Sequence, residues 1–170
     1  MKGGEDMGRY VNVCLNGHWS ISGRLLQNEQ YCEKCGQKII DKCPSCGAFI
    51  KELGQASIVS VGFQEYELAA YCKKCSKAYP WTQSALEATA KIILAENQLS
   101  DSDKKMLIAS LPDIIADTPK TELAAMRLKR AAASAGKFTT KALLQFAIDF
   151  GGSVALKALG LWLLFDQEQP

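Results

Sequence analysis

The sequence predicts an α+β protein, in which a small β-rich part is followed by an α-helical C-terminal region. All seven cysteines and the single histidine lie between residues 14 and 75. That part contains short runs of β-branched and aromatic residues, whereas the chain from Thr82 onward is rich in Ala, Leu, Lys and Glu with apolar positions at helical spacing. We therefore expect a boundary near Pro80 and Trp81, with domains at residues 1–81 and 82–170.

Four runs in the first domain have the composition of strands and are separated by glycine and aromatic residues. They are RYVNV (9–13), QKII (37–40), AFI (48–50) and IVSVGF (58–63).

Helix-start and helix-stop residues divide the second domain. Thr82 and Ser100 are expected to cap two helices, because a side-chain hydroxyl can accept from the free N–H groups of a first turn. Thr118 followed by Pro119 predicts the start of a third helix, and Gly136 predicts its end.

The cysteines and the histidine form four pairs with the spacing of metal-binding turns. The pairs are Cys14 with His18, Cys32 with Cys35, Cys43 with Cys46, and Cys72 with Cys75. A structural zinc site takes four such ligands in a tetrahedron. The pairs therefore predict two Zn²⁺ per chain, bound by a tandem zinc ribbon. Gly36, Gly47 and Ser76 each follow the second cysteine of a turn, where a positive φ is often needed.

Two arrangements of the pairs remain open. A sequential one joins the first pair with the second and the third with the fourth, whereas a crossed one, as in RING-type domains, joins first with third and second with fourth. The seven residues between Cys35 and Cys43 are more than RING domains place there, which favours the sequential arrangement. A redox dithiol usually has one Cys-x-x-Cys in a βαβ setting, and an iron–sulfur cluster does not explain the accompanying histidine site.

Nothing in the sequence favours catalysis, and we expect a non-enzyme. Once His18 and the cysteines bind metal, no Cys–His or Ser–His pair remains, and neither zinc keeps a position for a reactive water. The run ASAGKFTT suggests a phosphate-binding loop, but Ala131 replaces its first glycine and Phe138 follows its lysine.

Charge and targeting signals give weak constraints on partners. The formal net charge is +2. Seven thiolates with two Zn²⁺ bring the first domain to about −1, so nucleic acid is an alternative partner that is not favoured. Residues 1–12 are polar and glycine-rich, unlike a secretory signal, so we expect a reducing, cytoplasmic location.

The C-terminal segment predicts contact with another surface. Residues 119–141 carry six basic side chains and one acid, Glu122. Residues 142–165 are strongly apolar, with a narrow polar stripe that begins at Lys141 and ends at Lys157, and Gly151 with Gly152 can break them into two helices. We expect these helices to be covered by protein, mainly in a homo-oligomer, and the alternative is peripheral membrane association.

The motifs CLNGHWSI, YCEKCGQKIIDKCPSCG and YCKKCSKAYPWT, together with the helix TPKTELAAMRLKR, resemble an uncharacterised bacterial family, domain of unknown function 2321. The resemblance covers most of the chain and implies zinc binding with no established activity. We therefore expect a non-catalytic zinc-binding interaction module or adaptor that oligomerises through its C-terminal helices. The alternatives are a membrane-acting effector with a zinc-ribbon sensor, and a nucleic-acid-binding ribbon.

Overall fold

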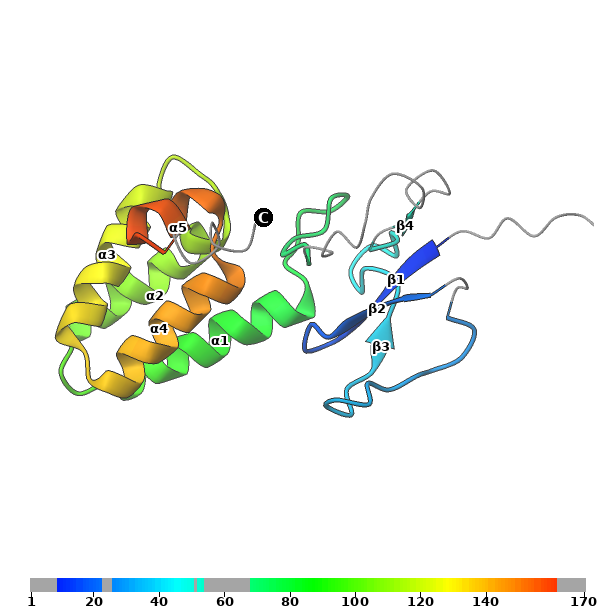
Figure 1. Cartoon of the computed structure of the whole chain (residues 1–170), viewed down its shortest axis with the longest axis horizontal. Helices are drawn as coiled ribbons and strands as arrows, with labels where there is room; N and C mark the ends of the chain where they lie inside the picture. Colours follow the sequence, from blue (N-terminus) through cyan, green and yellow to red (C-terminus); the bar gives the residue numbers. More distant parts are fainter. Residues whose placement is uncertain (1–8, 23–25, 51, 54–67, 162–170) are drawn as a thin grey trace, which may run out of the picture. The chain divides into compact units, whose positions relative to one another are not determined.

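The computed structural model describes residues 9–22, 26–50, 52–53 and 68–161 (Figure 1). The chain divides into two compact units, residues 1–84 and 85–170. An antiparallel sheet with several tight turns forms the first unit, and helices form the second. The predicted α+β class is therefore confirmed.

The first unit is organised around a central strand, β1. Strand β2 pairs antiparallel with one edge of β1, where Val13 lies opposite Trp19. Strands β3 and β4 share the other edge, with Val13 opposite Ile40 and Tyr10 opposite Glu52. The four strands are β1 (Arg9–Cys14), β2 (Trp19–Ser22), β3 (Ile39–Ile40) and β4 (Glu52–Leu53).

The strand predictions have different outcomes. RYVNV is confirmed as β1, and the end of QKII is confirmed as β3. AFI is wrong as a strand, because Phe49 makes only an isolated bridge with Lys42 in a cysteine turn. IVSVGF lies outside the described residues. β2 was not predicted, because its residues are mostly exposed and lack the apolar alternation of a half-buried strand.

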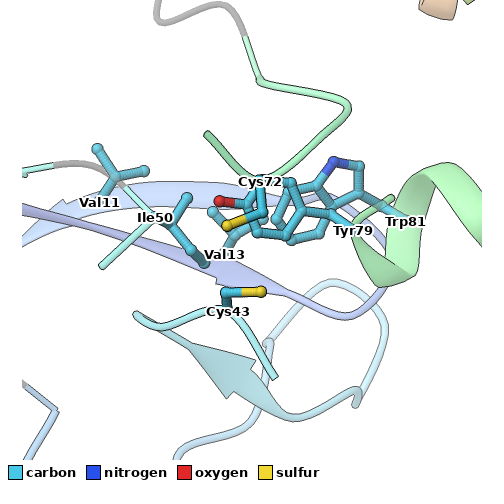
Figure 2. Close-up of a cluster of buried hydrophobic side chains, with 7 residues drawn as sticks. All are labelled: Val11, Val13, Cys43, Ile50, Cys72, Tyr79 and Trp81. Atoms are coloured by element: carbon cyan, nitrogen blue, oxygen red, sulfur yellow. The ribbon is translucent and has the colours of Figure 1, made fainter. Parts of the chain in front are cut away.

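A small core lies between the sheet and the segments that follow the cysteine turns (Figure 2). The rings of Tyr79 and Trp81 stack with their centroids 4.5 Å apart. The indole Nε1 of Trp81 donates to the Ala69 carbonyl at 3.0 Å, which satisfies its buried polar atom. The buried members of this core are Val11, Val13, Cys43, Ile50, Cys72, Tyr79 and Trp81. Two cysteines of the predicted metal sites are thus part of the hydrophobic core.

The helical part contains one helix that begins at the end of the first unit and four that lie wholly in the second. They are α1 (Pro80–Ala95), α2 (Asp101–Ile115), α3 (Thr121–Ser134), α4 (Lys137–Phe150) and α5 (Ser153–Leu159). In the second unit α3 packs against α2, α4 and α5. The residues buried between these helices are mostly Leu, Ile and Ala, and they include Leu107, Leu111, Ile114, Leu128 and Leu143.

Three of the predicted helix boundaries need correction, at Thr82, at Gly136 and at the start of α3. Thr82 is not a cap, because α1 begins at Pro80 and the Thr82 hydroxyl instead donates to the Ala70 carbonyl at 2.9 Å. Ser100 is confirmed as the cap of α2, and its hydroxyl accepts from Asp103 N–H at 3.1 Å. Gly136 does not end α3, which stops at Ser134; it is the N-cap of α4.

The start of α3 also differs from the prediction. Pro119 lies in a turn before the helix, which begins at Thr121. Thr118 still stabilises this start, because its hydroxyl accepts from Lys120 N–H at 3.2 Å, while the Thr121 hydroxyl donates to the Ala116 carbonyl at 2.7 Å. The threonines thus satisfy local backbone groups before the first helical turn.

Residues 142–161 do not form one long helix. The chain breaks at Gly151 and Gly152, between α4 and α5, as the two adjacent glycines predict. Residues 162–165 lie outside the described part. Among the described residues, none of the helices has both the length and the apolar character needed to cross a bilayer.

Candidate metal centres

Three tight cysteine turns in the first unit share one pattern of backbone hydrogen bonds. In the Cys43 turn, Cys43 N–H donates to the Ala48 carbonyl at 2.8 Å, and Gly47 N–H donates to the Cys43 carbonyl at 2.9 Å. The turns that begin at Cys32 and Cys72 repeat both bonds at 2.7–2.9 Å. We call these three segments the knuckles; they are residues 32–37, 43–48 and 72–77. Each knuckle brings its two cysteines to one side of the backbone.

The residue after the second cysteine has a positive φ in every knuckle. The values are 70° for Gly36, 71° for Gly47 and 57° for Ser76. Glycine adopts this conformation without a steric penalty, whereas serine does so at a cost because its Cβ approaches the backbone. The prediction from the two glycines and Ser76 is therefore confirmed.

The first candidate centre joins the β1–β2 hairpin to the first knuckle. Cys14 ends β1 and His18 immediately precedes β2, so the turn between them brings both side chains to one end of the hairpin. The Cys14 sulfur lies 3.7 Å from the Cys35 sulfur and 3.6 Å from the Nδ1 atom of His18. Cys32 lies 3.6 Å from the same Nδ1 atom. Three sulfurs and one nitrogen thus surround one point.

The second candidate centre joins the other two knuckles. The Cys43 and Cys75 sulfurs are 3.8 Å apart, and the Cys46 and Cys72 sulfurs are 3.7 Å apart. In each of the two groups all four ligand atoms lie within 4.8 Å of one another. The grouping is therefore sequential rather than crossed, and each group could hold one metal ion.

Separations between 3.6 and 3.8 Å distinguish these groups from disulfides. A disulfide holds its sulfurs at about 2.05 Å, and all seven cysteines are free. These separations are close to the edges of a tetrahedral metal site, and the remaining pairs of donor atoms lie within 4.8 Å of one another. The donor sets and their geometry therefore fit a metal ion at each centre.

Backbone N–H groups prepare one thiolate at each centre. The N–H groups of Cys75 and Lys74 lower the pKa of the Cys72 thiol to about 6, and the Lys74 N–H lies 3.4 Å from the sulfur. At Cys32 burial acts to raise the pKa, but the N–H groups of Lys34 and Cys35 outweigh it and lower the pKa to about 7. A deprotonated sulfur is the form that binds metal.

The remaining thiols show why a cation suits these clusters. At Cys46 the Ala48 N–H acts to lower the pKa, but burial and the neighbouring thiols outweigh it and raise the pKa to about 11. Burial likewise raises the pKa of Cys14. Without a metal ion, one thiolate opposes the ionisation of the next, as for any close pair of acids. A divalent cation removes this opposition and allows all the sulfurs to ionise.

Two features of the centres could not be assigned from ligand spacing. Ligand spacing does not determine which ring nitrogen of His18 would bind a metal ion. In the structure the Nδ1 atom lies near the sulfurs of Cys14 and Cys32, and the rest of the imidazole is exposed. The pair Tyr79 and Trp81 packs against Cys43 and Cys72 in the core. Their only signal in the sequence is two aromatic residues just after the last knuckle.

Comparison with known proteins gives a family but no activity. A family model described as an uncharacterized protein conserved in bacteria (DUF2321) matches residues 8–159. No curated protein and no solved structure matches the chain. Chemical conclusions must therefore come from the two centres themselves.

Proposed function

Because the chain belongs to this bacterial family, whose description names no activity, we propose from its own geometry that it is a zinc-stabilised interaction module. The module is non-catalytic and forms homo-oligomers through its C-terminal helices. The observation that carries the proposal is the pair of donor sets, each with four protein atoms within 4.8 Å of one another.

The separations between the donor atoms favour zinc. A zinc–sulfur bond of about 2.3 Å gives a sulfur–sulfur edge of about 3.8 Å in a regular tetrahedron, and a zinc–nitrogen bond of about 2.0–2.1 Å gives a sulfur–nitrogen edge of about 3.6 Å. The corresponding separations in the chain are 3.7 and 3.8 Å between sulfurs and 3.6 Å from the His18 nitrogen. Three cysteines with one histidine, and four cysteines, are both donor sets of structural zinc.

The same count of ligands supports a non-catalytic role. A catalytic zinc keeps one coordination position for water or substrate, whereas each centre here offers four protein ligands to one ion. Bound zinc would offset part of the negative charge of the clustered thiolates and hold the knuckles to the sheet. Its role would then be to maintain the small core rather than to activate a water molecule.

Exposed apolar side chains support an interaction role. Phe138 is 76% exposed and Met126 is 67% exposed in the helical unit, and Ile21 is 48% exposed on β2. Single exposed apolar residues are ordinary on proteins. Several large ones among the described residues favour a protein partner.

Metal analysis and light scattering test the proposal together. Protein purified without added metal should contain two zinc ions per chain, and its mass in solution should exceed that of one chain as concentration rises. One metal ion or none would contradict the zinc assignment. A single-chain mass at every concentration would contradict the oligomer, and peptidase or nuclease activity that His18→Ala removes without unfolding would contradict the non-catalytic role.

A further inference from the structure

The two candidate centres differ in how they are joined to the hydrophobic core of the first unit. All four cysteines of the second centre take part in that core, two as buried members and two packed against them. The buried ones are Cys43 and Cys72, in the same cluster as the stacked rings of Tyr79 and Trp81 (Figure 2). The four ligands of the first centre also lie in the described part of the chain, and none of them is a member of this cluster.

The first centre has one ligand on the surface. Cys14 and Cys32 are buried and Cys35 is partly buried, whereas His18 is exposed. Its Nδ1 atom nevertheless lies 3.6 Å from the sulfurs of Cys14 and Cys32. In the second centre every ligand is buried or partly buried. A ligand from solution can therefore reach the first centre beside the imidazole without displacing any residue of the core.

Backbone hydrogen bonds hold the first centre together independently of a metal ion. Cys14 N–H donates to the His18 carbonyl at 2.8 Å, which closes the β1–β2 hairpin. Leu15 N–H donates to the Lys38 carbonyl at 3.1 Å, and Cys14 lies opposite Ile39 in the pairing of β1 with β3. These bonds keep the hairpin beside the first knuckle. The three sulfurs thus keep their places when the exposed imidazole turns away.

The chemistry of the ligands gives the same order. Imidazole binds a metal ion in its neutral form, so its departure separates no opposite charges, whereas the departure of a thiolate does. That separation costs most inside a core, where the effective dielectric constant is low. The single neutral ligand of the eight is His18, and it occupies the exposed position. Opening the second centre would instead require a thiolate to leave a cation within the core.

We propose that the first centre exchanges its metal ion with the surroundings while the unit stays folded, and that the second centre retains its ion as part of the core. This inference rests on the proposed zinc binding and divides it between the two centres. The His18 imidazole is the ligand that opens. An entering ligand replaces it beside three sulfurs, so the exchange partner is a donor that suits zinc, a thiolate or an imidazole of another molecule.

Metal release from the full-length, zinc-loaded protein tests this division. In excess pyridylazoresorcinol, a chromogenic chelator, one zinc ion per chain should be released at least about tenfold faster than the other. Near-ultraviolet circular dichroism, to which the stacked rings of Tyr79 and Trp81 contribute, should stay constant in the fast phase and change in the slow one. Cadmium NMR separates a site of three sulfurs and one nitrogen from a site of four sulfurs. Zinc added to the cadmium-loaded protein should remove the resonance of the first kind of site before that of the second.

Substitutions assign each phase to its centre. His18→Ala should leave one zinc ion per chain, released at the slow rate, with the near-ultraviolet signal retained. His18→Cys supplies a fourth thiolate at the same position and should bring the fast rate toward the slow one. Cys46→Ala should instead remove the slowly released ion and weaken the near-ultraviolet signal. Asn16→Ser, at an exposed position in the turn that contains His18, is the matched control and should leave both rates unchanged.

The unfavourable results are distinguishable. A zinc-loaded protein with fewer than two ions would overturn the proposed zinc binding and this inference together. Release of both ions in a single phase, or a fast phase that takes the near-ultraviolet signal with it, would overturn the division between the centres alone. Earlier loss of the four-sulfur cadmium resonance would show that the second centre exchanges first, and would overturn the proposal in the same way.

Discussion

Replacing Cys72 by serine should remove one metal ion and strongly destabilise the first unit. The Cys72 side chain is 2% exposed and belongs both to the second metal centre and to the hydrophobic core beside Tyr79. Serine is a poor zinc ligand, and its hydroxyl would be buried among apolar side chains. The variant therefore loses a ligand and gains a buried polar group, which alone costs about 1–3 kcal/mol when it finds no partner.

The metal contribution is larger than that of the polar group. Structural zinc binds zinc-finger peptides with about 10–16 kcal/mol at neutral pH. At a free zinc concentration of about 1 µM, a site of that strength stabilises the folded form by about 2–8 kcal/mol. Whole domains are stable by only about 5–15 kcal/mol. Loss of one centre should therefore remove most of the stability of a unit whose described core has seven buried members.

Zinc-dependent unfolding measures this directly. The free energy of unfolding should rise by about 1.4 kcal/mol per bound ion for each tenfold rise in free zinc. The wild type should thus gain about 2.8 kcal/mol and a Cys72→Ser protein that still folds about 1.4 kcal/mol. Elemental analysis should find two ions and one ion, respectively. Lys73→Ser, at an exposed position in the same knuckle, is the control and should keep two ions.

The reasoning fails if Cys72→Ser keeps two zinc ions and unfolds at the same denaturant concentration as the wild type. It also fails if wild-type stability does not depend on free zinc. The first result would mean that Cys72 is not a ligand, and the second that the first unit folds without metal.

Three further predictions concern single positions outside the ligand set. The Thr139 hydroxyl and the N–H groups of Gln98 and Gly136 lower the pKa of the Glu96 carboxyl. Its stabilising effect should therefore be complete above the ordinary carboxyl pKa and be lost as pH falls through the lowered value. Denaturation of Glu96→Gln, followed by helical circular dichroism, should show a deficit at about pH 6 that shrinks as the solution is made more acidic than the ordinary carboxyl pKa. Gly152→Ala should lower stability by about 1–3 kcal/mol, because its new Cβ would collide with the Asp117 carboxylate, which accepts from both Ser153 and Val154. An unchanged melting temperature would contradict this contact. Ser76→Gly should raise stability in zinc-saturated buffer by up to about 1 kcal/mol, because serine holds a φ of 57° there; a loss of stability would contradict the strain argument.

Much of the candidate site could be predicted because its chemistry is local in the sequence. A Cys-x-x-Cys turn sets the direction of both sulfurs within four residues, and the glycine that follows it signals the positive φ seen at Gly36 and Gly47. The number of ligands then implies two ions. The choice of His18 Nδ1 could not be predicted, because it depends on how the β1–β2 hairpin meets the first knuckle.

Features that depend on distant partners were missed. β2 is held by backbone pairing to β1 rather than by an apolar face, so its side chains carry no periodic signal. Threonine is a residue type that favours helix N-caps, but the Thr82 hydroxyl donates to the carbonyl of Ala70, twelve residues earlier. Glycine is a residue type that often ends helices, but the N–H of Gly136 donates to the carboxylate of Glu96, forty residues earlier. Sequence preferences at helix ends give way when a tertiary contact offers the same hydrogen bond.

The repeated knuckle has a consequence for how this family can diversify. Each knuckle requires only its two cysteines and a residue that accepts a positive φ, while the two residues between the cysteines are exposed at its tip. Those tip residues are Glu33, Lys34, Pro44, Ser45, Lys73 and Lys74. Their charge can therefore change from one lineage to another without disturbing metal binding or the core. The tips can thus carry different side chains on an unchanged frame, and a change at these positions would alter only what each knuckle presents to solvent.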